Sequence, residues 1–272
     1  MGGAADSLRR DGFLRGPLAA VALIVFVVAP ACAANDAVID PDRPDTTNSA
    51  NPVAKGRVQL ETGAFYRRTS EAGGPAERRL SWEATVRIGI ANDVEFRIDS
   101  EPVVRVDNSR EETDVGDFTL GLKYRVVSTR EGEWWPALAL NPFVKLPTAQ
   151  EPIGSGETDA GLLLLASFNL PSDFALDVNA GAVLVGQPSG HLVQARASAS
   201  LSRRLIDGLS GFAELAFSSR DTREGRDGLV VQAGVIWRLT RDVALDTALS
   251  TSLAGAAPDF GVRAGVSIRF GR

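Results

Sequence analysis

The chain has 272 residues, a formal net charge of −5 and a sequence pI of about 5.1. Its lysines and arginines form no block, and together with the acidic balance this argues against a nucleic-acid partner. The length is sufficient for one large β domain or for two smaller domains, so length alone decides little.

Residues 1–33 have the layout of a secretory signal peptide. Arginines precede an apolar run, and Ala31, Cys32 and Ala33 form a small-x-small cleavage site. The run is shorter than the roughly 20 residues of a spanning helix, so we expect cleavage near Ala33. Lipid attachment at Cys32 is an alternative, which Pro30 and the lack of a preceding leucine oppose. Cleavage would leave no cysteine, which excludes a disulfide framework.

Residues 34–56 form a segment of different character. They are rich in proline, aspartate, asparagine, serine and threonine and have no hydrophobic period. Such a composition is typical of irregular structure rather than of a strand or helix. We expect this segment to be either a tail or a plug inside the domain that follows.

Residues 57–272 alternate between apolar and polar side chains in about twelve segments of roughly 10 to 13 residues. In the segment 79–93, for example, Trp82 and Val86 lie on one face and Arg87 lies on the other. The lengths suit tilted strands that cross a membrane. We therefore predict an all-β fold, an antiparallel transmembrane β-barrel with an up-and-down meander, of the kind found in Gram-negative outer membranes.

The connections between these segments support the barrel. Transmembrane barrels have short turns at one end and longer loops at the other, and the connections here alternate in this way. We expect short connections around residues 92–93, 129–133, 171–173, 206–210 and 240–242, and long polar ones at 69–78, 107–114, 147–158 and 219–227.

The phase of the alternation also predicts register at three turns. Residues that face each other across antiparallel strands must lie on the same side of the sheet. Pairing of Leu170 with Phe174, and of Leu239 with Val243, predicts three-residue turns.

At the third turn two registers are possible, which set Arg87 opposite either Arg97 or Asp99. Directly opposed like charges are unfavourable, so we predict the second register, with a turn at residues 92–94.

The polar faces of the strands point into the predicted barrel, since an interior about twelve strands wide could not be filled by the small apolar residues of the other face. Acidic and basic groups on this face could neutralise each other and fill the interior, or could line a path for solutes. The candidate lumen-lining residues are Glu61, Glu83, Arg87, Glu95, Arg97, Asp99, Lys123, Arg125, Asn141, Lys145, Gln194, Arg196, Gln232, Arg238, Asp246, Arg263 and Arg269.

No residue is a candidate for catalysis, and we expect neither a cofactor nor a bound metal. A barrel enzyme with a serine nucleophile would need a histidine beside the serine, but the only histidine, His191, lies in a loop pattern with Val193 two residues later. The acidic stretches 109–114 and 221–227 lack the spaced oxygen ligands of a calcium loop, so we interpret them as solvated outer loops.

Several short motifs give the chain a resemblance to a known family. In order they are "DRPDTTNS" (42–49), "KGRVQLETG" (55–63), "GDFTLGLKYR" (116–125), "KLPT" (145–148), "GSGETDAG" (154–161) and "AAPDF" (256–260). The chain resembles the phenol meta-pathway degradation family of bacterial, transporter-like outer-membrane β-barrels. This resemblance implies location and architecture, and an association with the catabolism of aromatic compounds. Ala149 stands where that family usually has a glycine after "LPT".

These observations favour a porin-like outer-membrane channel for small solutes, aromatic compounds among them. Its expected partners are outer-membrane lipid, the small-molecule solute, and the barrel-assembly machinery that commonly reads a C-terminal aromatic residue, here Phe270 with two residues added. One alternative is a closed structural or interaction barrel with an ion-paired lumen and acidic outer loops. Another is a soluble periplasmic β protein, which would have to hide its apolar strand faces.

Overall fold

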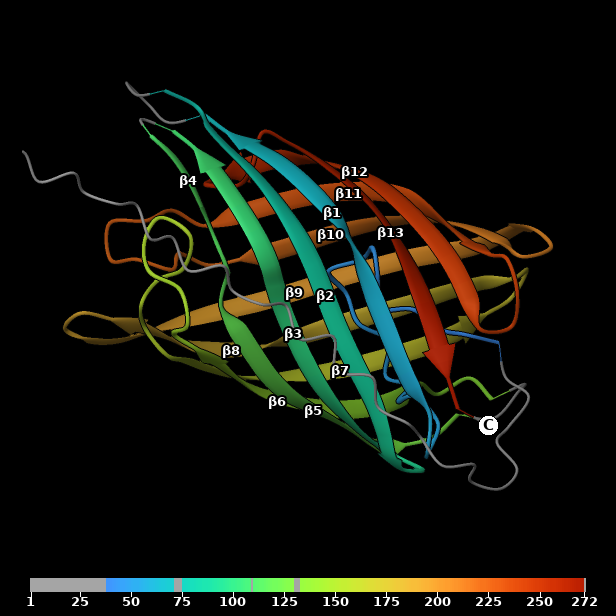
Figure 1. Cartoon of the computed structure of the whole chain (residues 1–272). Helices are drawn as coiled ribbons and strands as arrows, with labels where there is room; N and C mark the ends of the chain where they lie inside the picture. The colour runs from blue at the N-terminus through green and yellow to red at the C-terminus, as the bar shows by residue number, and fades with distance from the viewer. Residues whose placement is uncertain (1–37, 71–74, 109, 130–132, 272) are drawn as a thin grey trace, which may run out of the picture.

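The computed structural model describes residues 38–70, 75–108, 110–129 and 133–271. The predicted signal peptide, its cleavage site and Cys32 lie outside these residues. The described chain contains thirteen β-strands (Figure 1), which are β1 Val58–Thr69, β2 Glu77–Ala91, β3 Val94–Asp107, β4 Glu111–Asp114, β5 Phe118–Val127, β6 Ala137–Leu146, β7 Asp159–Leu170, β8 Phe174–Gln187, β9 Gly190–Ile206, β10 Leu209–Ser218, β11 Gly228–Arg238, β12 Val243–Gly255 and β13 Phe260–Phe270.

The strands form one closed antiparallel barrel. Apart from β4 and β5, strands adjacent in sequence pair with each other. β1 pairs with β13 from Val58↔Phe270 to Arg68↔Phe260, which joins the two ends of the sheet. The short β4 and the longer β5 both pair with β3, one beyond the other, so thirteen strands occupy twelve positions around the ring. The predicted meander barrel of about twelve strands is confirmed. Among the described residues no helix is long and apolar enough to span a membrane.

The exterior of the barrel is apolar and its interior is charged. Trp82 and Leu164 on the outward faces are 50% and 55% exposed, whereas the inward-facing Arg87, Glu95 and Lys123 are at most 1% exposed. A protein surrounded by water would reverse this arrangement, because charged groups are the most costly to bury. In an outer membrane the exposed apolar band contacts lipid, so the outward direction predicted for the apolar faces is confirmed.

The predicted register of the first turn is wrong, whereas that of the turn between β7 and β8 is confirmed. Arg87 pairs with Arg97, the strands meet at Ala91↔Val94, and the turn contains two residues rather than three. Leu170 does pair with Phe174.

The turn between β11 and β12 has the predicted contact as well. The amide of Leu239 donates to the carbonyl of Val243 at 2.9 Å. The physical reason for the different register at Arg87 is its contact with residues 38–56, which precede β1.

The long connection at 147–158 folds back against the barrel wall instead of standing free in solvent. Ala149 and Ile153 pack with Val104 and Val106 of β3 in a small buried apolar cluster. Arg79 on β2 holds the loop as well, because its Nη1 donates to the carbonyl of Ile153 at 2.9 Å.

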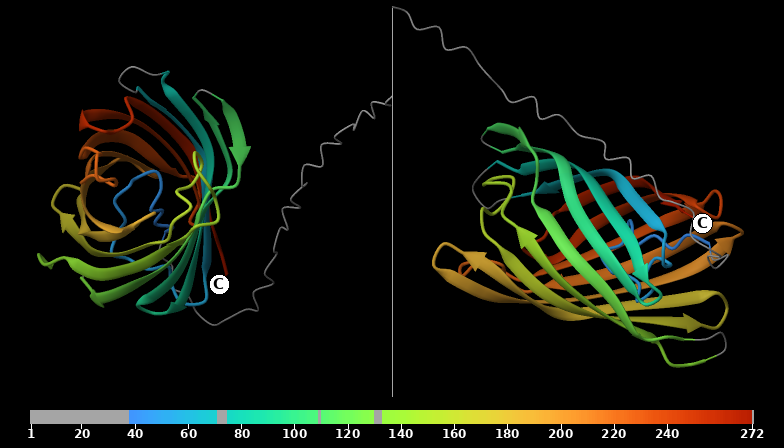
Figure 2. Two further views of the ribbon diagram at one scale, coloured as in Figure 1. Left: turned by 90° about the vertical axis from the view of Figure 1, so that its left-hand side faces the viewer. Right: turned by 60° about the horizontal axis from the view of Figure 1, so that its bottom comes forward.

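Residues 38–56, which we call the lumen segment, lie inside the ring of strands. Figure 2 shows this blue segment within the barrel when the molecule is viewed from one end. The amide of Ile39 donates to the carbonyl of Arg241 at 2.8 Å, and the amide of Gly56 donates to that of Gly89 at 2.8 Å. Both ends of the segment are therefore at the end of the barrel that carries the short turns, which we call the short-turn end.

Candidate functional site: the lumen

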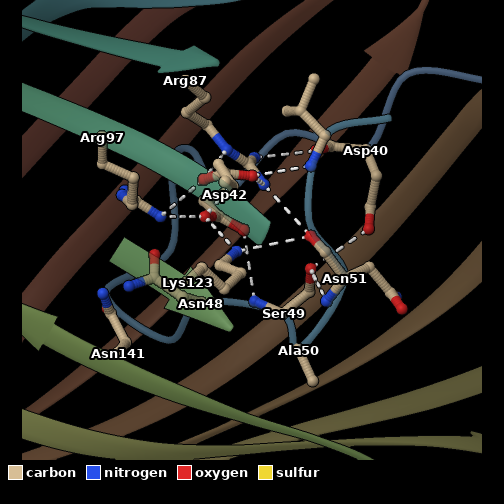
Figure 3. A network of polar contacts seen from close by, with 12 residues as sticks. Asp40, Asp42, Asn48, Ser49, Ala50, Asn51, Arg87, Arg97, Lys123 and Asn141 are labelled. Atoms are coloured by element: carbon tan, nitrogen blue, oxygen red, sulfur yellow. Dashed lines mark hydrogen bonds and ion pairs between the residues drawn. The ribbon is translucent and has the colours of Figure 1, made fainter. Parts of the chain in front are cut away.

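The centre of the lumen is a cluster of charges around Asp42 of the lumen segment (Figure 3). Lys123 Nζ lies 2.9 Å from Asp42 Oδ2, and Arg87 Nη1 lies 3.4 Å from the same oxygen. Arg97 Nη1 also donates to it. Burial alone would raise the pKa of Asp42, but the charges of these three cations outweigh burial and hold its pKa well below the usual range.

Two wall carboxylates complete the cluster. Glu95 accepts from Arg87 Nε at 2.8 Å, and Glu61 accepts from Arg87 Nη1 at 2.8 Å. Asp42, Glu61 and Glu95 thus face Arg87, Arg97 and Lys123, and the formal charges balance. This explains the register of the first turn, since Asp42 bridges the two opposed arginines and removes the repulsion on which the other register was predicted.

Arg43, the next residue, extends to other strands. Its Nη1 lies 2.6 Å from Glu83 Oε2, and its Nη2 lies 3.4 Å from Asp246 Oδ1. The guanidinium lies over the paired glycines Gly63 and Gly265, where an added Cβ would come within 2.6 and 2.7 Å of Nη2. The two glycines therefore provide the space that Arg43 occupies.

On the opposite wall, Glu214 of β10 holds the tip of the lumen segment. Its carboxylate accepts from the amides of Thr46 at 3.0 Å and Thr47 at 2.6 Å, and from the Thr47 hydroxyl at 2.5 Å. Gln232 Nε2 donates to it as well, at 3.2 Å. A carboxylate that accepts hydrogen bonds from successive backbone amides fixes the path of the chain. Because the acceptor is charged, these hydrogen bonds are stronger than neutral ones.

Asp45 lies beside this carboxylate and is less well supplied with partners. Ser200 Oγ donates to Asp45 Oδ2 at 2.5 Å, whereas Oδ1 is buried and has no hydrogen-bond partner within the described chain. Burial and the negative charge of Glu214 raise the pKa of Asp45 well above its ordinary value. The pKa values of Asp42 and Asp45, three positions apart, are therefore shifted in opposite directions.

Further along, wall side chains pair with the backbone of the segment. The backbone amide of Asn48 donates to Asn179 Oδ1 at 2.7 Å, and Asn179 Nδ2 donates to the backbone carbonyl of Asn48 at 2.8 Å. The amide of Ala50 donates to Ser167 Oγ at 2.8 Å, and that of Val53 donates to Glu95 at 2.7 Å. The segment thus crosses the lumen and is bound on several walls.

The predicted lumen residues fall into two groups. The first group hydrogen bonds or ion-pairs with the lumen segment, and comprises Glu61, Glu83, Arg87, Glu95, Arg97, Lys123, Arg125, Gln232, Arg238, Asp246 and Arg263. The second group contacts the wall or the loops, and comprises Asp99, Asn141, Lys145, Gln194, Arg196 and Arg269.

Sequence reasoning missed the residues of the segment itself and one important wall residue. Asp42, Arg43 and Asp45 lie in a stretch without period, which gave no signal for what its charges would contact. Glu214 does carry a signal, because it stands in inward phase between the outward Ala213 and Leu215.

Beyond the lumen segment, towards the end that carries the long loops (the long-loop end), the interior is hollow. A cavity of about 820 Å³ extends from Thr46 and Asn48 of the segment to Thr69 and Ala257 near the long loops. Within the described chain no group of three histidine, cysteine, aspartate or glutamate side chains is placed to hold a metal ion. The lumen therefore consists of a filled short-turn half and a hollow long-loop half.

The closed antiparallel barrel with an apolar exterior and a charged lumen defines an outer-membrane β-barrel. The chain belongs to the family described as "Putative MetA-pathway of phenol degradation", whose model matches residues 41–270. No curated protein matches the sequence.

Solved structures with a similar fold include an outer membrane channel from Pseudomonas putida F1 and the NanC porin. The first has a TM-score of 0.63 and 16% identity, with 85% of this chain and 100% of that chain covered. The second has a TM-score of 0.53 and 13% identity, with 77% and 98% covered. At these identities the likeness concerns the fold.

Proposed function

We propose that the protein is an outer-membrane channel that transports small solutes, aromatic compounds among them, through its charged lumen. The observation that carries the proposal is the cavity of about 820 Å³ enclosed by a membrane barrel, since its volume suits small organic molecules. The family description, and the channel and the porin among the similar structures, support the same class of function.

The lumen segment is the element that controls passage in this proposal. It occupies the short-turn half of the lumen and is held by side chains rather than by strand pairing. Hydrogen bonds of this kind can be exchanged for water one at a time, so the segment can leave without opening the barrel. The charged wall residues then line the path that it vacates.

The proposal includes no reaction. His191, the only histidine of the chain, is exposed and lies on β9 rather than in the expected loop. The C-terminal strand β13 ends at Phe270, and we propose that this aromatic residue is read by the barrel-assembly machinery.

A disulfide lock tests the role of the lumen segment within one protein. We replace Asn48 and Asn179 by cysteine, because the side chain of Asn179 hydrogen bonds to the backbone of Asn48. Currents of the refolded protein are recorded in planar bilayers. We expect few openings in the oxidised form and a return of current on reduction. The single variant Asn179→Cys is the matched control, and deletion of residues 34–56 should give the largest currents.

A second candidate function is a closed structural or interaction barrel. The burial of Arg87, Lys123 and Glu95 to at most 1% exposure within a charge-balanced cluster favours it, because such a cluster can serve to fill the interior. Absence of current from the oxidised, reduced and deleted forms, each correctly folded, would establish this candidate and exclude the channel.

A further inference from the structure

The hollow half of the lumen contains more positive charge than its carboxylates neutralise. Four arginines line the cavity. Arg97 is engaged with Asp42 and Asp99, and Arg263 lies 3.7 Å from Glu83 and donates to the carbonyl of Pro44.

The other two arginines, Arg67 and Arg196, form no ion pair within 4.0 Å in the described part of the chain. Arg196 Nε donates to Gln194 Oε1 at 2.8 Å. More distant carboxylates act on each arginine, namely Glu101 and Glu77 on Arg67, and Asp159 and Asp221 on Arg196. Arg67 pairs in register with Arg79, and Arg79 Nη2 lies 2.5 Å from Glu101. Three carboxylates line the cavity. Asp99 is paired with Arg97, whereas Glu77 is the first residue of β2 and Asp221 lies in the loop before β11, both at the outer limit of the cavity. Inside it, the cationic groups dominate.

The unpaired arginines lie on opposite walls. Arg67 is on β1 and Arg196 is on β9, and in the order of the sheet these strands are separated by β10, β11, β12 and β13 on one side. A ring of twelve positions places such strands almost across the lumen from each other. An anion between them would receive hydrogen bonds from more than one direction, as planar carboxylates do in arginine sites.

Of the three phenylalanines that line the same cavity, Phe65 and Phe143 each lie against a glycine of the neighbouring strand. The ring of Phe65 lies 4.1 Å from Arg263 Cζ and 5.9 Å from Arg67 Cζ, next to Gly261, where an added Cβ would come within 3.0 Å of the ring. The ring of Phe143 occupies the place that a side chain at Gly161 would need. Glycine thus lets both rings lie close to the wall and leaves the centre of the cavity open.

We propose that this cavity is a binding site for an aromatic carboxylate, a small planar anion of the benzoate type. Arg67 and Arg196 bind the carboxylate, and Phe65 and Phe143 contact the ring, because aromatic faces and edges attract one another and an arginine over Phe65 extends the stack. This inference rests on the proposed channel function, and names its substrate class. A neutral phenol would leave both arginines without a direct ion-pair partner.

The test is isothermal titration of the refolded full chain with benzoate, benzyl alcohol and cyclohexanecarboxylate. We expect benzoate to bind at least about tenfold more tightly than either of the others, since a charge-assisted hydrogen bond and an aromatic contact are each worth about that factor. Arg67→Gln and Arg196→Gln should each weaken benzoate binding about tenfold and leave benzyl alcohol unchanged. Arg204→Gln, which alters an arginine paired with Asp173 outside the cavity, should leave both unchanged.

Equal binding of benzoate and benzyl alcohol, or benzoate binding that is insensitive to both arginine variants, would overturn the inference. Circular dichroism of each variant verifies that the barrel is formed. Bilayer currents of the same preparations separate the two proposals. Currents without selective benzoate binding overturn the binding site alone, whereas selective binding without current in any form overturns the channel alone.

Discussion

The short-turn half and the long-loop half of the lumen are built from the same alternating strands, yet their charges are treated in opposite ways. In the short-turn half, Asp42 enters from a separate segment and completes a balanced cluster with Arg87 and its neighbours. In the long-loop half, Arg67 and Arg196 line a cavity without such a partner. One wall composition therefore serves either to hold a segment of the chain or to attract a solute, depending on whether the chain itself supplies the counter-charge.

The largest effect is expected from Asp42→Asn. This substitution leaves Arg87, Arg97 and Lys123 facing only Glu61 and Glu95, so the cluster carries an uncompensated buried charge. Loss of one partner from a buried ion pair costs about 3–5 kcal/mol. We expect a lower free energy of unfolding and longer channel openings, measured by denaturant titration and bilayer recording.

Asp40→Asn is the matched control for this variant. Asp40 lies in the same segment, but its side chain is 49% exposed and lies 3.9 Å from Arg238. A similar change in both variants would mean that the charge of the segment as a whole matters, rather than the cluster around Asp42.

A smaller effect is expected from the pH dependence of Asp45. Its pKa is raised in the docked segment, so docking favours the protonated form and is strongest below the ordinary aspartate pKa of about 3.9. This contribution is lost as pH rises from there through the raised pKa. The negative charges of Glu214, Asp177 and Asp42 also raise the pKa of Asp45, whereas the hydrogen bond from Ser200 lowers it.

Bilayer recording between pH 4 and pH 8 measures this effect as the fraction of time open. We expect openings to increase with pH in the wild type and to increase less steeply in Asp45→Asn. The lowered pKa of Asp42 acts in the opposite direction, but only in stronger acid, below the window of Asp45. Openings that decrease as pH rises would contradict the docking role of Asp45.

The smallest effect is expected from Arg204→Ala. Arg204 Nη2 lies 2.6 Å from Asp173 Oδ1 at the short-turn end, and both side chains are more than half exposed. Water screens such pairs, so the free energy of unfolding should change by less than about 1 kcal/mol. A loss as large as that of Asp42→Asn would show that burial does not distinguish the ion pairs of this barrel.

Much of the fold could be predicted because strand alternation is a local property. The phase around Trp82 and Arg87 is sufficient to assign each face, and closure follows from the apolar exterior. The register at Arg87 could not be predicted in the same way, since it depends on Asp42, a residue from outside the strand pair. The role of Asp45 could not be predicted for the same reason, since its partner Ser200 is 155 positions away. Glu214, in contrast, could have been identified from its phase alone.

The lumen segment continues directly into β1 at Val58, so it remains attached to the pore that it fills. A released segment of this kind stays within the reach of a short chain, at an effective concentration in the millimolar range. Its return to the lumen is an intramolecular reaction whose rate does not depend on how many copies the membrane contains. In the proposed channel, the time that each molecule spends open is therefore a property of its own chain, set by the lumen segment and by the wall residues that bind it, and can be adjusted there one residue at a time.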